Sequence, residues 1–233
     1  MATVSDFPPA MSATRPAAAP ISCSRCCTGR RLCCGRPLIE MGWADAARRQ
    51  WRRTLDTLAD DIAAGVPVVG VEPSCTVAFR DELVALFPDD PVARRLSAQT
   101  RSLGELLAET GHRPPPRQGR VLYHHHCQGH AVLDADREPE LLRRMGLDVE
   151  VLDSGCCGMA GSFGFERDKY DLSVALASRV LLPAIRAAPD ALVVADGFSC
   201  REQLRQLTGV RPLHLAEIMR DGAAPTRPLL PLR

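Results

Sequence analysis

The sequence has few aromatic residues, almost no lysine and no long apolar segment. Aromatic residues make up 4% of the 233 positions and the formal net charge is +1, so neither base stacking nor a basic surface favours nucleic-acid binding. Lys169 is the only lysine. No stretch reaches the roughly 18 apolar residues that a membrane-spanning helix needs.

The start of the chain also lacks the pattern of an export signal. It is rich in alanine and proline and has no charged segment followed by an apolar one. We therefore expect a cytoplasmic protein, with any contact with the inner membrane made through partners. Ten cysteines in such a chain, two pairs of which directly precede glycine, favour thiolate ligands over a disulfide framework.

The most informative pattern is a cysteine motif that occurs twice. Each copy has a Cys-Cys-Gly triplet and a later lone cysteine that follows a β-like run: Cys33-Cys34-Gly35 with Cys75, and Cys156-Cys157-Gly158 with Cys200. The lone cysteine lies 40 residues after the glycine in the first copy and 42 in the second. This spacing predicts two copies of one folding unit.

Composition and periodicity divide the chain into five segments. We expect a disordered leader (1–32), a first unit truncated at its N-terminus (33–112), a proline-rich linker (113–119), a complete second unit (120–222) and a tail (223–233). In the first unit we expect helices over 41–64, from 80 and across 96–107, and a strand over 66–71. In the second we expect strands over 120–125, 149–153 and 191–196, and helices over 137–145, 166–187, 200–208 and 214–220. Such alternation predicts an α/β fold with parallel sheets.

Four cysteines of the second unit fall just past the expected carboxyl ends of its strands: Cys127, Cys156, Cys157 and Cys200. Open α/β sheets build their sites at this edge, and four thiolates suit either an iron–sulfur cluster or zinc. Gly158 and Gly161 allow backbone N–H groups to turn toward sulfur, which favours the cluster. The alternative is that these cysteines are small core residues beside a tight turn. The glycines do not fit the dinucleotide-binding pattern.

Three histidines, His124 to His126, directly precede Cys127. Successive side chains of a strand alternate between faces, so all three cannot reach one metal. We expect one of them, His126, to donate a hydrogen bond to a cluster sulfur. The sequence contains no recognisable catalytic triad or pair of acidic residues with general acid–base spacing.

The first copy of the motif is incomplete. A cysteine equivalent to Cys127 would stand at position 4, which is Val4. Cys23, Cys26 and Cys27 lie nearby, but no expected strand precedes them. The first unit is therefore left with three candidate ligands, Cys33, Cys34 and Cys75.

These motifs resemble the cysteine-rich CCG family, of the heterodisulfide reductase and glycolate oxidase iron–sulfur subunit type. The resemblance is greatest to the C-terminal part of FAD-linked 2-hydroxy-acid oxidases and covers about residues 32–222, with segments such as Glu72-Pro73-Ser74-Cys75 and Gly197-Phe198-Ser199-Cys200. It implies electron transfer through an iron–sulfur cluster, expected to be [4Fe–4S]. The partner would be a flavoprotein dehydrogenase that carries FAD and a ferredoxin module.

The chain departs from the family pattern where a closing Cys-x-x-Cys is usual. Gln203 stands three residues after Cys200, and Thr76 to Ala78 follow Cys75, so a fifth thiolate is missing from both units and electron relay is favoured over disulfide reduction. The chain has no ferredoxin cysteine run and no expected flavin domain or substrate site. We therefore expect the C-terminal piece of such an enzyme, joined to an unrelated leader before Leu32. Two alternatives stay open: a non-catalytic remnant and a zinc-stabilised binding module.

Overall fold

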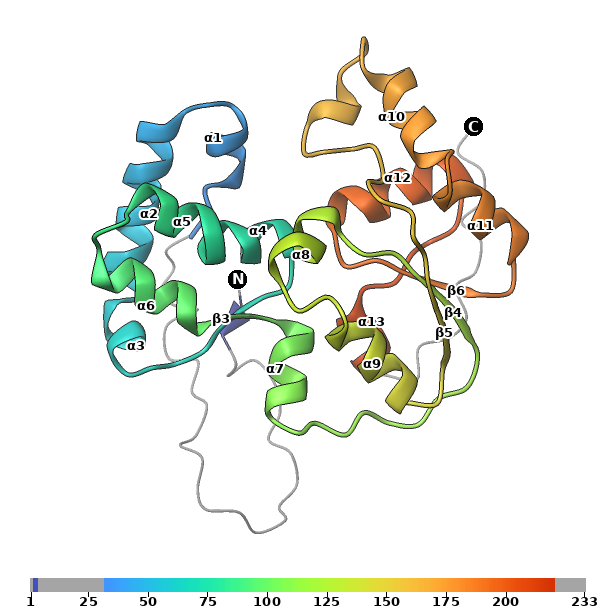
Figure 1. Ribbon diagram of the computed structural model, residues 1–233, viewed down its shortest axis with the longest axis horizontal. Helices are drawn as coiled ribbons and strands as arrows, with labels where there is room; N and C mark the ends of the chain where they lie inside the picture. Colours follow the sequence, from blue (N-terminus) through green and yellow to red (C-terminus); the bar gives the residue numbers. More distant parts are fainter. Residues whose placement is uncertain (1, 4–31, 221–233) are drawn as a thin grey trace.

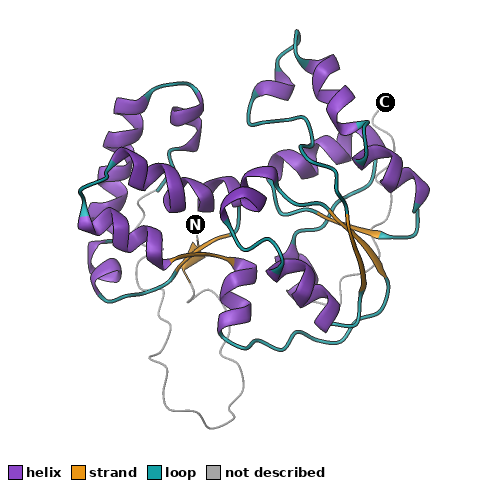
Figure 2. Cartoon of the chain, in the orientation of Figure 1, coloured by secondary structure: helices purple, strands orange, loops and turns teal. Residues whose placement is uncertain are grey.

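The computed structural model describes residues 2–3 and 32–220, and it contains two three-stranded sheets flanked by helices (Figures 1 and 2). The expected leader and tail lie outside these residues, apart from Leu32 and Ala2–Thr3. Ala2–Thr3 forms a short strand, β1, where we expected disorder. Among the described helices, none has the length and apolar character needed to cross a membrane.

The first half holds one sheet and its helices. Its elements are β1 (Ala2–Thr3), α1 (Arg36–Glu40), α2 (Ala44–Thr57), α3 (Ala59–Ala63), β2 (Val68–Gly70), α4 (Pro73–Val77), the π-helical turn η2 (Ala78–Glu82), α5 (Leu83–Leu86), α6 (Pro91–Gln99), β3 (Thr100–Ser102) and α7 (Leu103–Glu109). The strand order is β1-β2-β3, in which β2 and β3 are parallel and β1 is antiparallel to β2. Trp51, Phe79 and Leu96 fill the core between β2 and the helices.

One expected helix of the first half is wrong. We expected a helix across 96–107, but β3 interrupts it and α7 begins only at Leu103. The Ser102 side chain accepts from Glu105 N, while the Glu105 side chain accepts from Ser102 N, so the two residues form a capping box. Such a box starts a new helix because it satisfies N–H groups that have no partner within the helix.

The second half is built on a sheet of three parallel strands. Its elements are β4 (Arg120–Tyr123), α8 (Cys127–Val132), α9 (Arg137–Arg144), β5 (Asp148–Val151), the 3-10 turn η3 (Phe163–Phe165), α10 (Tyr170–Ala177), α11 (Leu181–Ala187), β6 (Leu192–Val194), α12 (Phe198–Thr208) and α13 (Leu215–Arg220). β4 lies in the centre, between β5 and β6. The expected α/β class with parallel sheets is confirmed.

The central strand separates two cores. Val121 and Tyr123 pack toward one face with residues of α9 and α13, while Leu122 packs toward the other with residues of α10, α11 and α12. This alternation is that of a strand buried on both faces. The expected helix over 166–187 divides into α10 and α11 because Pro183 has no N–H to donate to residue 179 and its ring would clash there.

One of the hydrophobic cores contains residues from both halves. Val69 of β2 and Leu103 of α7 belong to the same buried cluster as Val121, Leu142 and Ile218 of the second half. The segment 113–119 connects the halves without helix or strand. Because the core is continuous across the junction, the halves are held in one arrangement.

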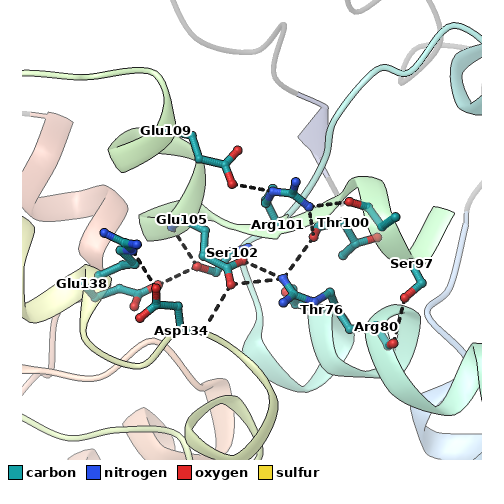
Figure 3. Close-up of polar contacts among 12 residues, drawn as sticks. Thr76, Arg80, Ser97, Thr100, Arg101, Ser102, Glu105, Glu109, Asp134 and Glu138 are labelled. Atoms are coloured by element: carbon teal, nitrogen blue, oxygen red, sulfur yellow. Dashed lines mark hydrogen bonds and ion pairs between the residues drawn. The ribbon is translucent and has the colours of Figure 1, made fainter. Parts of the chain in front are cut away.

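A buried polar network crosses the same junction (Figure 3). The Ser102 hydroxyl donates to Glu138 Oε1 at 2.8 Å, and Arg80 pairs with Glu105 at 2.9 Å. Glu138 packs directly against Gly104, where a Cβ atom would lie 2.5 Å from its carboxyl carbon. Burial, together with the nearby Asp196 and Glu105 carboxylates, raises the pKa of Glu138 to about 7, although the Ser102 hydrogen bond lowers it.

The raised pKa predicts a pH-dependent junction. The native chain keeps a proton on Glu138 that the unfolded chain releases near pH 4.5. The contribution of this proton to the free energy of unfolding is therefore complete below pH 4.5 and is lost as the pH rises through about 7. The loss is about 3 kcal/mol, at about 1.4 kcal/mol per pH unit. Urea unfolding from pH 5 to 8 should show this slope in the wild type but not in Glu138→Gln. Glu140→Gln, on the exposed face of α9, should keep it; an unchanged slope in Glu138→Gln would contradict the assignment.

Candidate metal centre

Three loops bring four thiols to the carboxyl edge of the second sheet. Cys127 begins α8 after β4, Cys156 and Cys157 lie in the loop after β5, and Cys200 is the third residue of α12 after β6. Because the three strands are parallel, these loops leave the sheet at the same edge. All seven cysteines within residues 32–220 are unpaired thiols, which agrees with the expectation of ligands over disulfides.

The four thiols interact with one another in a row. Cys156 interacts with the side chains of Cys127 and Cys157, and Cys157 interacts in turn with Cys200. Cys157 and Cys200 are buried, Cys156 is half-buried and Cys127 is exposed. The row therefore runs from the solvent-accessible surface into the core.

Proton sharing along this row produces an alternation of charge. Hydrogen bonds from neighbouring thiols lower the pKa of Cys156 and of Cys200. The donating thiols, Cys127 and Cys157, have raised pKa values because of the same bonds and of burial. Thiolates at Cys156 and Cys200 thus alternate along the row with thiols at Cys127 and Cys157, and the thiols must release their protons when a metal binds.

A histidine lies at the buried end of the row. His124 is 1% exposed, and its ligand nitrogen and the sulfurs of Cys157 and Cys200 all lie within 4.8 Å of one another. Among the described residues no other group of three or more such side chains is as compact. Strand alternation limits how many histidines can face the thiols, but the sequence alone does not say that His124 does.

His126, the histidine predicted to donate to a cluster sulfur, lies beside the Cys200 thiol. A Cβ atom on Gly197 would lie 2.3 Å from His126 Cδ2 and 3.2 Å from the Cys200 sulfur, so the imidazole and the thiol flank this glycine. His126 Nδ1 is buried and has no hydrogen-bond partner. The role of His126 as a donor to sulfur stays a prediction.

The Cys-Cys-Gly loop has a backbone that favours glycine. Gly158 has φ +95°, and a Cβ atom there would lie 2.1 Å from the Ser173 carbonyl oxygen of α10. Its N–H donates to the Cys156 sulfur at 3.3 Å, the contact expected for a tuning hydrogen bond. Gly161, also a predicted neighbour of the cluster, lies against Glu40 of the first half.

Gln203 holds the Cys-Cys-Gly loop of the second half in place. Its buried side chain donates to the Cys157 carbonyl oxygen at 3.2 Å and to the Ser173 hydroxyl at 2.9 Å. This residue replaces the second cysteine of the family's Cys-x-x-Cys pattern. The sequence showed the replacement but not that its amide holds the loop.

The first half gathers its three cysteines in a similar way. The thiol of Cys75, on α4, lowers the pKa of Cys34 to about 7, and Cys33 contributes a further hydrogen bond. Gly35 N donates to the Cys33 sulfur at 3.5 Å. Trp51 holds the loop through a 2.5 Å hydrogen bond from its indole nitrogen to the Cys34 carbonyl oxygen, a contact that the sequence did not indicate.

Direct contacts join the two cysteine groups. Glu72, three residues before Cys75, accepts from Phe198 N at the start of α12 at 2.7 Å. The Ser74 hydroxyl holds the same carboxylate at 3.0 Å. α4 and α8 lie side by side at the centre of Figure 1. The helices that carry Cys75, Cys127 and Cys200 therefore meet at the junction.

A small cavity lies beside these loops, at the carboxyl ends of strands from both sheets. It is lined by His125, His130, Asp196 and His214 among others and has a volume of about 30 Å³. His214 donates from Nε2 to the Val71 carbonyl oxygen and accepts at Nδ1 from Ala216 N, so it caps the start of α13. This space is about that of one water molecule.

Several known proteins are similar to this chain in sequence. Residues 121–205 match the family model of the CCG cysteine-rich domain. The chain is 32% identical over 200 residues to one of the subunits of the anaerobic glycerol-3-phosphate dehydrogenase of Escherichia coli, and the match covers 84% of the chain and 50% of that protein. It is 25% identical to the D-2-hydroxyglutarate dehydrogenase of Pantoea ananatis, over 72% of the chain and 16% of the relative.

A third relative is nearer in length. The lactate utilization protein A of Bacillus subtilis is 25% identical over 81% of the chain and 83% of its own length. The chain spans about half the length of the glycerol-3-phosphate dehydrogenase subunits that it matches. No solved structure matches it. The stretch that matches the CCG cysteine-rich domain therefore contains the four cysteines at the carboxyl edge of the second sheet.

Proposed function

We propose that this protein is an iron–sulfur electron-transfer component of a flavin-dependent 2-hydroxy-acid oxidoreductase. The observation that carries this proposal is the row of four thiols from three loops, of which two have lowered pKa values. The relatives named as dehydrogenases of hydroxyglutarate and glycerol 3-phosphate support the reaction class.

The proposed ligands of the cluster are Cys127, Cys156, Cys157 and Cys200. Four thiolates at one sheet edge fit a [4Fe–4S] cluster, which supplies one-electron transfer when bound. The chain's own residues hold the group and limit water access, since Cys157 and Cys200 are buried. The Gly158 N–H, already directed at the Cys156 sulfur, stabilises negative charge at that sulfur.

We also infer that the two halves are copies of one unit, the first of which is incomplete. Cys75 and Cys200 are each the third residue of a helix that follows a strand with a parallel neighbour. In the first copy, Cys33, Cys34 and Cys75 provide three donors. They form a second, partial metal site next to the complete one.

The substrate and the flavin are assigned to a partner. In this proposal the chain takes electrons from a flavoprotein dehydrogenase that carries FAD and a ferredoxin module, and the relatives named as dehydrogenases support such a partner. We place the protein in the cytoplasm, with membrane contact only through partners.

A structural zinc site is the second candidate. The compact group of His124, Cys157 and Cys200 has donor types that zinc commonly binds. A third possibility is a non-catalytic remnant without metal, which would have the same fold.

Metal content separates these functions. We expect about four iron and four sulfide per chain after anaerobic purification, with an EPR signal after dithionite reduction that disappears in Cys157→Ala. The reason is that Cys157 lies within the buried part of the row. Cys33→Ala, in the first copy, should retain this cluster and serves as the control. Stoichiometric zinc would favour a structural module, and a folded metal-free wild type would favour the remnant.

A pair of glycine variants tests whether loop geometry holds the metal. Gly158→Ala places a Cβ atom 2.1 Å from a backbone oxygen at a positive φ, so we expect a loss of about 3 kcal/mol or more in the free energy of unfolding and loss of bound iron. Gly155 also has a positive φ but nothing within 4 Å of its Cβ position. Gly155→Ala should therefore cost about 1 kcal/mol and retain iron. Equal iron content in both variants would contradict this role for the loop.

A further inference from the structure

We propose that His124 is a metal ligand of this centre, through Nε2, and that Ser154 orients it. The proposal adds a nitrogen donor to the thiol set. It rests on the proposed function only in requiring that the site holds a metal, and it does not require that the metal be an iron–sulfur cluster.

The position of His124 follows from the central strand. Its N–H continues the pairing of β4 with β6 by donating to the Val194 carbonyl oxygen at 2.9 Å. Because side chains alternate along a strand, His124 shares the face of Leu122, which packs in the same buried cluster as Cys157 and Cys200. His125 instead contacts the rings of Tyr123 and His130, on the side of the small cavity.

One ring nitrogen of His124 has no hydrogen-bond partner among the described residues. His124 is 1% exposed, and its Nε2 atom is buried without a hydrogen-bond partner. A ligand nitrogen of the imidazole lies within 4.8 Å of the Cys157 and Cys200 sulfurs, yet Nε2 makes no hydrogen bond to either of them. Buried polar atoms in native proteins normally have a partner, and a metal ion shared with the two sulfurs provides one.

The other side of the ring fixes the tautomer. His124 Nδ1 lies 2.7 Å from Ser154 Oγ, and this hydroxyl lies 3.5 Å from the Leu152 carbonyl oxygen. The arrangement that satisfies these atoms has Nδ1–H donating to Ser154 and the Ser154 hydroxyl donating to Leu152. It leaves a lone pair on Nε2. Histidines that bind metals typically donate their other N–H to an oxygen in this way.

A neutral imidazole changes the chemistry of the centre. It adds a ligand to the centre without the further negative charge that another thiolate would bring. His124, Cys157 and Cys200 would form the buried side of the ligand set, with Cys127 and Cys156 on the solvent side.

Pulsed EPR tests ligation directly. The protein is labelled with ¹⁵N-histidine, purified anaerobically and reduced with dithionite. We expect hyperfine coupling to a directly bound imidazole nitrogen in the wild type and in His125→Ala, and its loss in His124→Ala. Circular dichroism of the metal-free variants establishes folding. The wild-type spectrum alone remains decisive if His124→Ala does not fold, since a cluster without imidazole coupling overturns the proposal.

Cobalt binding gives a second measurement that needs no cluster. Co²⁺ is titrated into the reduced, metal-free chain and followed by its thiolate charge-transfer band. We expect the Kd to rise about 100-fold in His124→Ala and about 10-fold in Ser154→Ala, with no rise in His125→Ala. Equal Kd values in the wild type and His124→Ala would overturn the proposal. If the purified chain carries no iron or sulfide but its Kd for Co²⁺ still rises in His124→Ala, the ligand role of His124 is supported and the iron–sulfur function is not.

Discussion

The parallel pairing of β4 with both of its neighbours is the constraint on which the candidate site depends. Since β4, β5 and β6 run in the same direction, their carboxyl ends meet at one edge, and three loops distant in sequence deliver cysteines to the same place. The alternation of β4 also divides the two cores and turns His124 toward the thiols. A strand reversed in this sheet would place its cysteine loop at the opposite edge.

The junction between the halves makes the two cysteine groups one structural unit. Three kinds of interaction cross it: the shared apolar core, the hydrogen bond from Ser102 to Glu138 and the hydrogen bond from Phe198 N to Glu72. Glu72 belongs to the first cysteine motif, while Phe198 begins the helix that carries Cys200. Each motif therefore helps to position the other. The proline-rich linker does not separate independent domains.

Local sequence signals predicted the second half better than the first. Long apolar runs and turn residues located β4 and β6, and the cysteines that follow them were identified as candidate ligands. The short strand β3 was missed because Thr100–Ser102 is polar and its burial comes from tertiary contacts. The Ser102–Glu105 capping box was a signal that could have located the break. The sequence did not show that His124 faces the thiols. That position depends on where β4 ends and on where Ser154 lies, and no local sequence pattern contains this information.

The residues that replace the family's fifth cysteine bear on the type of chemistry. Gln203 stands at that position in the second half, and its amide nitrogen donates to the Cys157 carbonyl oxygen and to Ser173. It is a support for the loop and offers no sulfur to an incoming disulfide. In the first half Ala78, at the same spacing from Cys75, is fully buried. Without a further thiolate, cleavage of a disulfide is disfavoured, whereas one-electron transfer requires only that the metal be held in place with little rearrangement. The buried end of the thiol row and the hydrogen-bonded loop around it meet that requirement, which is the physical reason for preferring relay over bond cleavage.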